Sequence, residues 1–490
     1  MSVIPFLIFI FLLIIRKRSL LFSSIFTLIA YTVLAISYWA ILPSYLYASY
    51  GKGFLVALDI FIIVFGAIFF LKILEDLKII KNISYYLESF SKDYRVQIIV
   101  IAWFFSSLLE GTAGFGIPAA VAVPLLVGVG LSPIKALIVG LLGNSTAGVF
   151  GAVGTPIRVG FSGFDSFLIP FSSALLNFVG IIVPIFMLWT ITSGRLNRKK
   201  EFLDALPFAI WSGLLFTIPS FFSVFLGQEF PSIVGSAVGL ILIIISIRFK
   251  IFIPKENLSL CEEKEITHNL SLFKSFLPYI LLVTFLILGK VFIGNIGIPL
   301  FSGFNHTFSL FNPGFVFIIV GLLVLLIWKK YKIVLFDSIN KAIKGSIHPF
   351  LVIISMSVIA QIMINSGHNL SGIPAVIDII ANGFESKFLP LFTPFVGAFG
   401  SFITGSVTVS NIMFGNILVT AGGVFDFETW KILSLCVVGA AAGNMIALAD
   451  ILTAEAVIGV KNAERQILKG VFIPCFVYLL IVGLIGYFIL

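Results

Sequence analysis

Charged residues are scarce in this sequence. Asp, Glu, Lys and Arg together account for 11% of its 490 residues, whereas a soluble domain carries about a quarter. The apolar share is 59% and the mean hydropathy is +1.16. A water-soluble fold of this length could not cover so much apolar surface, because its outside must be largely polar. The shortage of charge therefore excludes a soluble protein and predicts an integral membrane protein.

Paired cysteines and catalytic motifs are also missing. Cys261, Cys436 and Cys475 are far apart and form no C-x-x-C pair, so neither a disulfide framework nor a cysteine metal site is predicted. The sequence has no H-E-x-x-H motif, no G-x-S-x-G motif and no G-x-x-x-x-G-K-[ST] loop. These absences argue against a membrane enzyme and an ATP-driven pump. We expect no cofactor other than a coupling proton.

The basic residues do not indicate a nucleic-acid partner. The net charge is +9, but its Lys and Arg residues cluster in short loops around 78–95, 195–200, 248–274 and 329–344. The positive-inside rule places such loops on the cytoplasmic side, where anionic lipids attract them. The lipid bilayer is therefore the expected large partner, and no nucleic acid is expected.

Apolar runs recur from one end of the chain to the other. Because a spanning helix needs about 20 apolar residues, we predict an all-α polytopic membrane protein with about 12 to 14 membrane segments. The first run is followed by Arg16 to Arg18 and preceded by no basic residue, so we expect a retained span that begins outside. The candidate segments are Val3–Ile15, Leu20–Leu42, Phe54–Leu74, Val96–Leu109, Phe167–Thr190, Leu206–Leu226, Ile233–Ile247, Phe276–Ile293, Gly314–Trp328, Ile347–Ile364, Leu389–Phe402, Ile412–Ala421, Ile432–Leu452 and Gly470–Leu490.

Two regions interrupt this apolar pattern with Gly, Ser, Thr and Asn. In each, a Thr- and Gly-containing stretch precedes an apolar helix that ends in Gly-Asn. The pattern predicts one membrane domain, 1–490, with structural repeats at about 54–190 and 345–490 joined through the cytoplasmic loop 248–274. A merely long, solvated loop is the alternative for 248–274. The stretches are EGTAGFGIPAA (Glu110–Ala120) with GLLGNSTAGVFGAVGTPI (Gly140–Ile157), and GSFITGSVTVSN (Gly400–Asn411) with GAAAGNMIALADIL (Gly439–Leu452).

Glycine-rich interruptions at membrane depth predict a polar cavity. A broken helix frees N–H and C=O groups, each of which costs several kcal/mol in hydrocarbon unless it faces protein or water. The N-termini of half-helices carry partial positive charge and favour anions. We therefore expect the interrupted helices to meet at an anion site near the midplane. Close helix packing is the alternative use of small residues, and we expect it for Gly235 and Gly239.

The interrupted stretches resemble a known family. They are similar to signature stretches of bacterial and archaeal lactate permeases, densely over 53–163 and again over 397–469. The resembling stretches are VFGAIFFLKIL (Val64–Leu74), RVQIIVIAWFFSSLLEG (Arg95–Gly111), EGTAGFGIP (Glu110–Pro118), GNSTAGVFGAVGTPI (Gly143–Ile157) and GSFITGSVTVSN (Gly400–Asn411).

The resemblance implies a secondary transporter in a prokaryotic cytoplasmic membrane. Its expected cargo is L-lactate, glycolate or a similar 2-hydroxy monocarboxylate, imported by proton symport. The expected fold has two repeats with broken and re-entrant helices, similar to the wider ion-transporter superfamily. A carrier of another organic anion such as a dicarboxylate, or an anion channel, remains the alternative.

The sequence departs from the family pattern at two places. An Asp commonly follows the second Ser of the family's GS-x-x-TGS-x-T-x-SN stretch, whereas this chain has Val407. Ser-Pro-Gln usually follows Gly-Asn-Met-Ile, whereas Ala447, Leu448 and Ala449 stand here. One candidate proton carrier and two hydrogen-bonding groups are thereby lost.

Two acidic residues within apolar runs are candidate proton carriers. Glu110 ends a run that holds no charge after Arg95. A charge at bilayer depth costs about 3 kcal/mol on insertion scales, and a proton removes this cost by neutralising the carboxylate. A structural ion pair or an interfacial position is the alternative for Glu110. Asp450 either takes over the acidic role missing at Val407 or marks an interfacial helix end.

The remaining candidates would bind the substrate. A guanidinium can grip a carboxylate through two hydrogen bonds, so Arg158 is a candidate, although pairing with Asp165 is the alternative. Neutral donors and acceptors suit a substrate that must also leave, and some of them must instead bond helix backbones. These candidates are Thr112, Gly114, Gly116, Asn144, Ser145, Thr146, Thr155, Thr404, Ser406, Thr408, Ser410, Asn411 and Asn444.

Overall fold

A computed structural model gives the fold as a bundle of membrane helices, which confirms the predicted all-α polytopic class. Besides helices and loops, the described residues contain one pair of antiparallel strands, β1 and β2, which precede α15 in the chain. The described residues are 1–16, 18–114, 117–260, 271–293, 297–300, 306–309, 311–329, 331–460 and 463–489.

The N-terminal part of the chain is almost continuously helical. Its longest helix, α3, begins at a proline, which suits the first turn of a helix because its missing N–H is not needed there. The elements are α1 (Ile4–Ile10), a π-helical turn (Phe11–Ile15), α2 (Leu20–Ser37), α3 (Pro43–Asp76), α4 (Ile79–Ser89), α5 (Tyr94–Ile99), a second π-helical turn (Val100–Phe105) and α6 (Ser106–Thr112).

The middle of the chain contains the most interrupted helices. Its elements are α7 (Ile117–Gly128), α8 (Pro133–Gly143), a 3₁₀ turn (Thr146–Phe150), α9 (Gly151–Arg158), α10 (Leu168–Leu176), a 3₁₀ turn (Asn177–Ile181), α11 (Ile182–Thr192), α12 (Arg198–Ser223), a 3₁₀ turn (Val224–Leu226), α13 (Pro231–Arg248), α14 (Leu272–Ile293), β1 (Gly297–Leu300) and β2 (His306–Ser309).

The C-terminal part again combines long and broken helices. Its elements are α15 (Pro313–Ile327), α16 (Tyr331–Asn365), α17 (Val376–Ala381), a 3₁₀ turn (Asn382–Phe384), α18 (Leu389–Thr404), α19 (Val407–Gly423), α20 (Thr429–Gly443), a 3₁₀ turn (Asn444–Ile446), α21 (Leu448–Ile458) and α22 (Glu464–Phe488).

Most apolar segments of the described chain are long enough to cross a bilayer. Eleven helical stretches meet this length and hydropathy requirement, and the pair Val376–Phe384 and Leu389–Thr404, bent by 119°, would make a twelfth. The predicted first span, Val3–Ile15, corresponds only to a short apolar helix, Ile4–Leu13. At a rise of about 1.5 Å per residue, this helix covers roughly half of the hydrocarbon core. The other shorter apolar helices are Pro118–Gly128, Pro313–Ile327 and Val407–Gly423.

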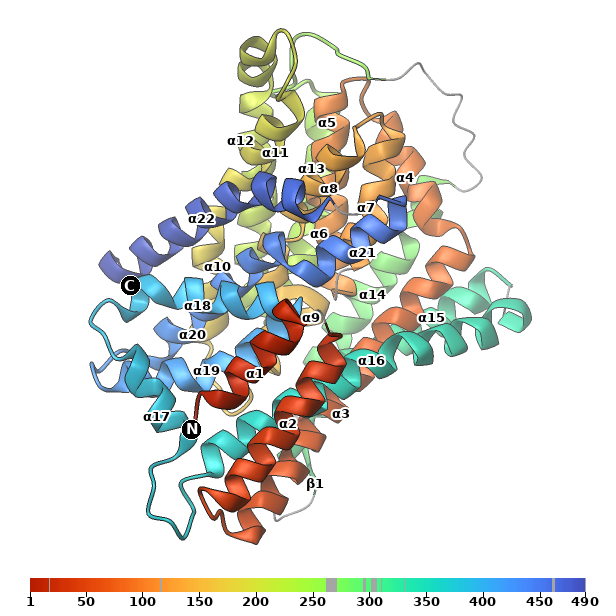
Figure 1. The fold of residues 1–490 in the computed structure, drawn as a ribbon. Coiled ribbons are helices and arrows are strands. Elements are labelled where there is room, and N and C mark those ends of the chain that lie inside the picture. The colour runs from red at the N-terminus through yellow and green to blue at the C-terminus, as the bar shows by residue number, and fades with distance from the viewer. Residues whose placement is uncertain are drawn as a thin grey trace.

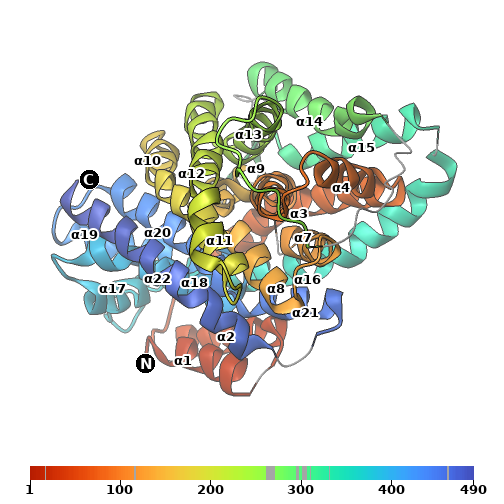
Figure 2. The same ribbon diagram turned by 90° about the horizontal axis from the view of Figure 1, so that it is seen from above.

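The helices form two groups with the interrupted helices between them. Figures 1 and 2 show α17 to α20 and α22 on one side and α3, α4 and α14 to α16 on the other. Helices α6 to α9 lie between these groups in Figure 1, and Figure 2 shows α7 to α9 near the middle of the view. The long helices α3 and α16 pack along each other, as do α18 and α20. The interrupted helices are therefore covered on both sides, as broken backbone in a membrane requires.

Two helix ends are built alike and turn the chain back at the centre. The hydroxyls of Thr112 and Thr404 each donate to the carbonyl four residues earlier, at 3.0 and 2.8 Å. A glycine with left-handed backbone follows each threonine, Gly114 with φ 59° and Gly405 with φ 68°. Only glycine adopts this conformation without cost. Both hairpins, α6 with α7 and α18 with α19, pack their two helices together.

The glycines of α13 serve close packing, as predicted. A Cβ at Gly235 would collide with Ser220 of α12, and one at Gly239 would collide with Phe104 and the Leu215 carbonyl. The two helices approach each other closely because these positions carry no side chain. Gly235 and Gly239 therefore belong to a helix interface.

Candidate functional site

Four interrupted stretches of the chain meet around one small cavity. Its volume is about 20 Å³, which is room for about one water molecule. The lining comes from the end of α6, the start of α9, the start of α19 and the turn after α20. A lactate ion is larger than this, so the cavity is too small to hold one in the described conformation. The lining residues are Glu110, Gly114, Gly151, Ala152, Pro156, Gly405, Ser406, Val407, Thr408 and Asn444.

The Glu110 carboxyl group lies buried at this cavity. Only 4% of the residue is exposed, and its Oε2 atom has no hydrogen-bond partner among the described residues. The other oxygen, Oε1, lies directly against the backbone of Gly151, where a Cβ would collide with it. An oxygen buried without a partner costs free energy. Glu110 is thus placed to hold a proton or to bond a group that enters the cavity.

A second carboxyl group, that of Asp450 on α21, lies close by. It is buried and close enough to Glu110 to interact with it electrostatically. Asn144, at the end of α8, donates through Nδ2 to Asp450 Oδ2 at 3.4 Å. The Oδ1 atom of Asn144 is buried without a partner in the described chain. The two predicted proton carriers therefore form one cluster, although 340 positions separate them in sequence (450 − 110 = 340).

The N-terminus of α19 faces the cavity. Ser406 caps this helix, because its Oγ accepts from the Val409 N–H at 3.3 Å. Val407 and Thr408, in the first turn, line the cavity. Since the N–H groups of a first turn have no partner within the helix, this end attracts anions. The Thr408 hydroxyl has no hydrogen bond to any described residue, so it is available to a ligand.

Asn444, directly after α20, lines the cavity from another segment of the chain. It stands where α20 gives way to a 3₁₀ turn. Its side chain is buried, and its Oδ1 has no partner within the described residues. An amide offers both a donor and an acceptor. Asn444 can therefore bond both a carboxylate and a hydroxyl group.

The backbone is strained where α9 meets the cavity. Ala152, Val153 and Gly154 have left-handed φ angles of 40°, 57° and 73°. A β-branched residue such as valine rarely adopts this conformation, which costs about 1–2 kcal/mol per residue. The Thr155 hydroxyl donates to the Ala152 carbonyl across this turn. Strain of this kind persists only where the surrounding structure imposes it, and it gathers at functional sites.

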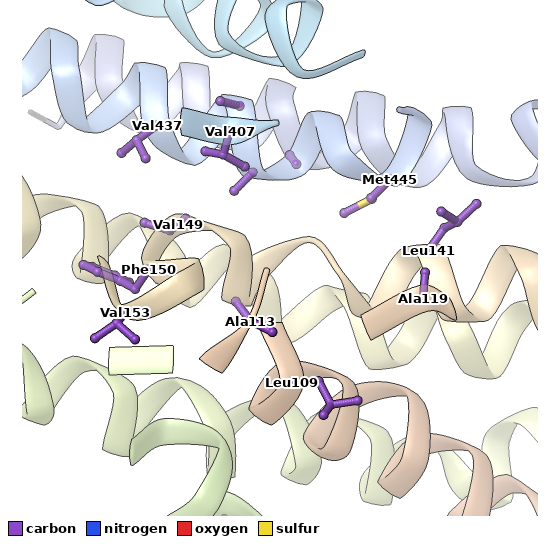
Figure 3. Close-up of a cluster of buried hydrophobic side chains, with 14 of the residues drawn as sticks. Leu109, Ala113, Ala119, Leu141, Val149, Phe150, Val153, Val407, Val437 and Met445 are labelled. Atoms are coloured by element: carbon purple, nitrogen blue, oxygen red, sulfur yellow. The ribbon is translucent and has the colours of Figure 1, made fainter. Parts of the chain in front are cut away.

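A cluster of buried hydrophobic side chains includes one residue of the cavity lining. Figure 3 shows Val407 and Val437 on the upper helices and Leu109, Ala113 and Val153 on the helices below them. Each of the five is buried. Val407 is the one of the five that lines the cavity.

Several predicted substrate ligands are instead bonded to the protein's own backbone. The Ser410 hydroxyl donates to the Gly397 carbonyl at 2.8 Å, and Asn411 donates to the Pro156 carbonyl at 2.9 Å. Both contacts join neighbouring elements, so a structural role accounts for them. The predicted residues that do not line the cavity are Thr112, Asn144, Ser145, Thr146, Thr155, Arg158, Thr404, Ser410, Asn411 and Asp450, of which Asn144 and Asp450 form the carboxyl cluster.

Ser145 and Thr146 face away from the cavity. The Ser145 hydroxyl donates to the Leu142 carbonyl at 2.7 Å. Thr146 packs against Gly180, where a Cβ would collide with its side chain, and its carbonyl accepts from Asn177 at 3.1 Å. This pair secures the turn after α8. Gly116, also predicted at the site, lies outside the described residues.

Arg158 lies in a separate charged cluster beyond the cavity. Its guanidinium interacts electrostatically with the carboxylates of Glu229 and Asp59, more strongly with Glu229. Glu229 is buried and forms an ion pair with Lys290 at 3.1 Å. The Nη1 atom of Arg158 has no hydrogen-bond partner among the described residues. Arg158 is therefore placed near carboxylates other than the suggested Asp165, and outside the cavity lining.

Sequence reasoning missed five lining residues. Gly405 and Gly151 bring backbone to the cavity, and Ala152, Pro156 and Val407 contribute small or apolar surface. Glycine, alanine and valine carry no chemical signal that separates them from packing residues. Only their position in the sequence could have identified them, because all five lie inside the interrupted stretches.

The departures from the family pattern lie at the same place. Val407 lines the cavity, and Ala449 is the neighbour that a Cβ at Gly405 would meet at 2.7 Å. Asp450 follows Ala449 directly and brings a carboxyl group to this spot. Its Oδ1 atom lies 3.9 Å from the position that a Cβ on Gly405 would take, two residues before Val407.

Comparison with known proteins agrees with this architecture. The family model for L-lactate permease matches residues 1–309 and 298–490. A putative L-lactate permease of Haemophilus influenzae is 27% identical over 469 residues, covering 86% of this chain and 85% of that protein. An L-lactate permease of Salmonella typhimurium is 25% identical over 532 residues, covering 98% and 94%. A glycolate permease of Escherichia coli is 24% identical over 498 residues, covering 90% and 86%.

These matches extend over the whole chain and include its interrupted stretches. Together with the apolar helices, they indicate a transporter rather than an enzyme, and a multi-pass protein of a prokaryotic cell membrane. The family match, the membrane helices and the small cavity lead to the same result, and the chain belongs to the L-lactate permease family.

Proposed function

We propose that this protein imports L-lactate, glycolate or a related 2-hydroxy monocarboxylate by proton symport. The observation that supports it most directly is the cavity in which a helix N-terminus, Thr408 and Asn444 lie beside the buried Glu110. The relatives named L-lactate permease and glycolate permease supply the substrate class.

The substrate carboxylate binds at the N-terminus of α19. There the first-turn N–H groups and the Thr408 hydroxyl offer donors to an anion. The 2-hydroxy group bonds the Asn444 amide, which can donate and accept. Among the described residues no Lys or Arg lines the cavity, so the anion is held by neutral groups and can leave again.

The proton promotes substrate binding because it reduces electrostatic repulsion. When Glu110 and Asp450 are ionised, two negative charges lie close to the position of the substrate carboxylate and oppose its binding. A proton on the pair lowers this repulsion, and a protonated carboxyl group also becomes a donor to the substrate. Anion and proton therefore bind together, which is the requirement for symport.

The charge at the cavity favours a monocarboxylate over a dicarboxylate. A second substrate carboxylate would need another positive group, and the candidate for this role, Arg158, lies with Glu229 and Asp59 instead. The small cavity of about 20 Å³ also favours a carrier that alternates between conformations over an open anion channel.

The two similarly built hairpins suggest how the protein opens. We propose that the regions 54–190 and 345–490 are structural repeats, which would place Thr112 with Gly114 and Thr404 with Gly405 at equivalent positions. Movement of one hairpin relative to the other would enlarge the cavity on one side at a time.

Uptake into liposomes tests the proposal. The purified protein is reconstituted, and uptake of labelled L-lactate is followed with and without an inward proton gradient. We expect saturable uptake that the gradient accelerates, that glycolate inhibits and that succinate inhibits poorly. A matched experiment with a sodium gradient separates the two coupling ions. Absence of lactate uptake by folded protein would contradict the assigned substrate.

The variant Glu110→Gln separates coupling from substrate binding. Glutamine keeps the size of the side chain but cannot carry a proton, so we expect gradient-driven accumulation to be lost while lactate exchange is retained. Asp337→Asn is the matched control, because Asp337 lies in α16 away from the cavity and its side chain is 58% exposed. Equal accumulation by Glu110→Gln and the normal protein would rule out this role for Glu110.

A further inference from the structure

A second and larger cavity opens between helices α8, α11, α12 and α22. Its volume is about 560 Å³, within the range of about 300–1,000 Å³ that small-molecule sites occupy. Figure 2 shows α11, α22 and α8 close to one another near the middle of the view, and each of these helices contacts the other two. None of its lining residues also lines the small cavity beside Glu110.

The walls of this groove are apolar. Ile138 of α8, Phe186 and Trp189 of α11 and Ile473 of α22 are among its lining residues. Trp189 and Ile473 remain 55% and 65% exposed, so the apolar surface continues outward from the groove. Large apolar surface of this kind faces hydrocarbon chains in a membrane protein.

Two lysines stand in the same groove. Lys135 Nζ donates to the Ile191 carbonyl at 3.1 Å and also to the Ser193 carbonyl, which leaves one of its three N–H donors for a ligand. Lys469 is exposed and has no ion pair with any described residue. Both amines therefore offer positive charge at one end of the apolar walls.

Further cations surround this end of the groove. Arg195 and Arg198 lie close enough to Lys135 to repel it electrostatically, while the nearby Glu201 attracts it. The Glu201 carboxylate is already paired with Arg195 at 2.7 Å. Counting Lys135, Arg195 and Arg198 against the one carboxylate of Glu201, the local charge is net positive.

Trp189 marks the level of the membrane interface. The Arg198 guanidinium lies over its ring at 4.0 Å, and Phe202 meets it edge-on at 5.8 Å. Tryptophan and basic residues gather where hydrocarbon meets the headgroups. The basic segment 195–200 assigns this end of the helices to the cytoplasm by the positive-inside rule.

We propose that the groove is a binding site for one anionic glycerophospholipid of the inner leaflet. Its phosphate lies between Lys135 and Lys469, and an acyl chain lies along Phe186, Trp189 and Ile473. Basic pockets between membrane helices on the cytoplasmic side bind such headgroups. The combination of a cationic end with apolar walls suits a lipid better than a soluble anion, which would not use the walls.

Native mass spectrometry of the purified full-length protein tests this site. The probes are phosphatidylglycerol and phosphatidylcholine with identical acyl chains, added to delipidated protein in detergent. We expect phosphatidylglycerol to be retained more tightly. We also expect Lys469→Gln to lower the apparent affinity for phosphatidylglycerol about fivefold. One lysine near a membrane surface strengthens the binding of anionic lipid by about this factor. Ile473→Ser should weaken the retention of both lipids.

The double variant Lys199→Gln/Lys344→Gln is the control for loss of charge alone. Both lysines are exposed and neither lines the groove, so we expect no change in lipid retention. Lys135→Gln also removes two backbone contacts, and the test therefore relies on Lys469. Equal retention of the two lipids, an equal loss in the control variant, or complete displacement of phosphatidylglycerol by inorganic phosphate would overturn the proposal.

Discussion

Glu110 and Asp450 belong to helices from opposite ends of the chain, yet their carboxyl groups interact. Apolar residues surround both, and Asn144 supplies a donor to Asp450. Ionisable groups that interact strongly exchange protons as a pair rather than one by one. The proton of the proposed symport therefore belongs to the cluster as a whole.

A double-mutant cycle tests this pairing. We expect Glu110→Gln and Asp450→Asn each to abolish gradient-driven lactate accumulation, and the double variant to lose no more than either alone. Residues that act as one unit are not additive. Initial rates in liposomes at several internal and external pH values provide the measurement. Additive losses would indicate two independent proton sites.

Thr408 contributes to substrate affinity through its hydroxyl group. It lies in the first turn of α19 and lines the cavity. We expect Thr408→Val to raise the KM for lactate about fivefold, the effect of one neutral hydrogen bond of about 1 kcal/mol. Uptake kinetics measure the change.

The control for this substitution is Thr284→Val. Thr284 is exposed on α14 and bonds the Ile280 carbonyl at 2.8 Å within its own helix, so its removal should leave the KM unchanged. A normal KM in Thr408→Val would place the substrate elsewhere.

At the scale of elements, the central hairpins depend on glycines in left-handed turns. Gly405 has φ 68°, and a Cβ there would lie 2.7 Å from the Ala449 Cβ. The turn must therefore remain free of a side chain for α18 and α19 to meet α21. A comparable turn at Gly114 joins α6 to the stretch before α7.

The variant Gly405→Ala separates strain from steric contact. Alanine costs about 1–2 kcal/mol in this conformation, and contact with Ala449 adds to that. We expect a lower apparent melting temperature in detergent and a lower rate of lactate uptake. Gly372→Ala is the matched control, because Gly372 has the same φ of 68° with nothing within 4 Å of the added Cβ. A similar fall in melting temperature for both variants would show that contact at Ala449 is unimportant.

At the scale of the whole molecule, one buried guanidinium joins several segments at the basic end of the bundle. Arg95 is fully buried and forms ion pairs with Asp93 at 2.7 Å and Asp204 at 3.1 Å. It also donates to the carbonyls of Glu201 and Glu256, at 2.7 and 2.8 Å. These contacts connect α5 to α12 and to the loop after α13.

We expect Arg95→Met to destabilise the protein by about 3–5 kcal/mol. Removal of the guanidinium leaves the buried Asp93 carboxylate without its ion pair. Arg95→Lys should recover only part of the loss, because an ammonium cannot reproduce the planar set of donors. Thermal unfolding in detergent measures both variants. Unchanged stability in Arg95→Met would show that water replaces the guanidinium.

Part of the site could be predicted because some residues carry a chemical signal. Glu110 stands out as a charge in an apolar run, and Asn444 and Thr408 as polar groups beside glycines. Asn411 carries the same signal but bonds the Pro156 carbonyl, 255 positions away. Sequence alone cannot separate these two uses, since the partner is distant in the chain. Arg158 likewise interacts with Glu229 and does not line the cavity.

The sequence by itself determined the membrane environment, most of the spans and the stretches where helices break. These follow from local properties, namely the cost of charge in hydrocarbon and the freedom of glycine. The short helices at Ile4–Leu13, Pro313–Ile327 and Val407–Gly423 were the exceptions, because hydropathy does not set where a helix ends.

Only the tertiary structure decided which polar groups share a cavity, how small that cavity is and that Asp450 stands beside Glu110. These are distances between segments far apart in sequence. They depend on how helices pack around small residues and on which buried polar atoms find partners, and neither is encoded in the neighbourhood of any one residue.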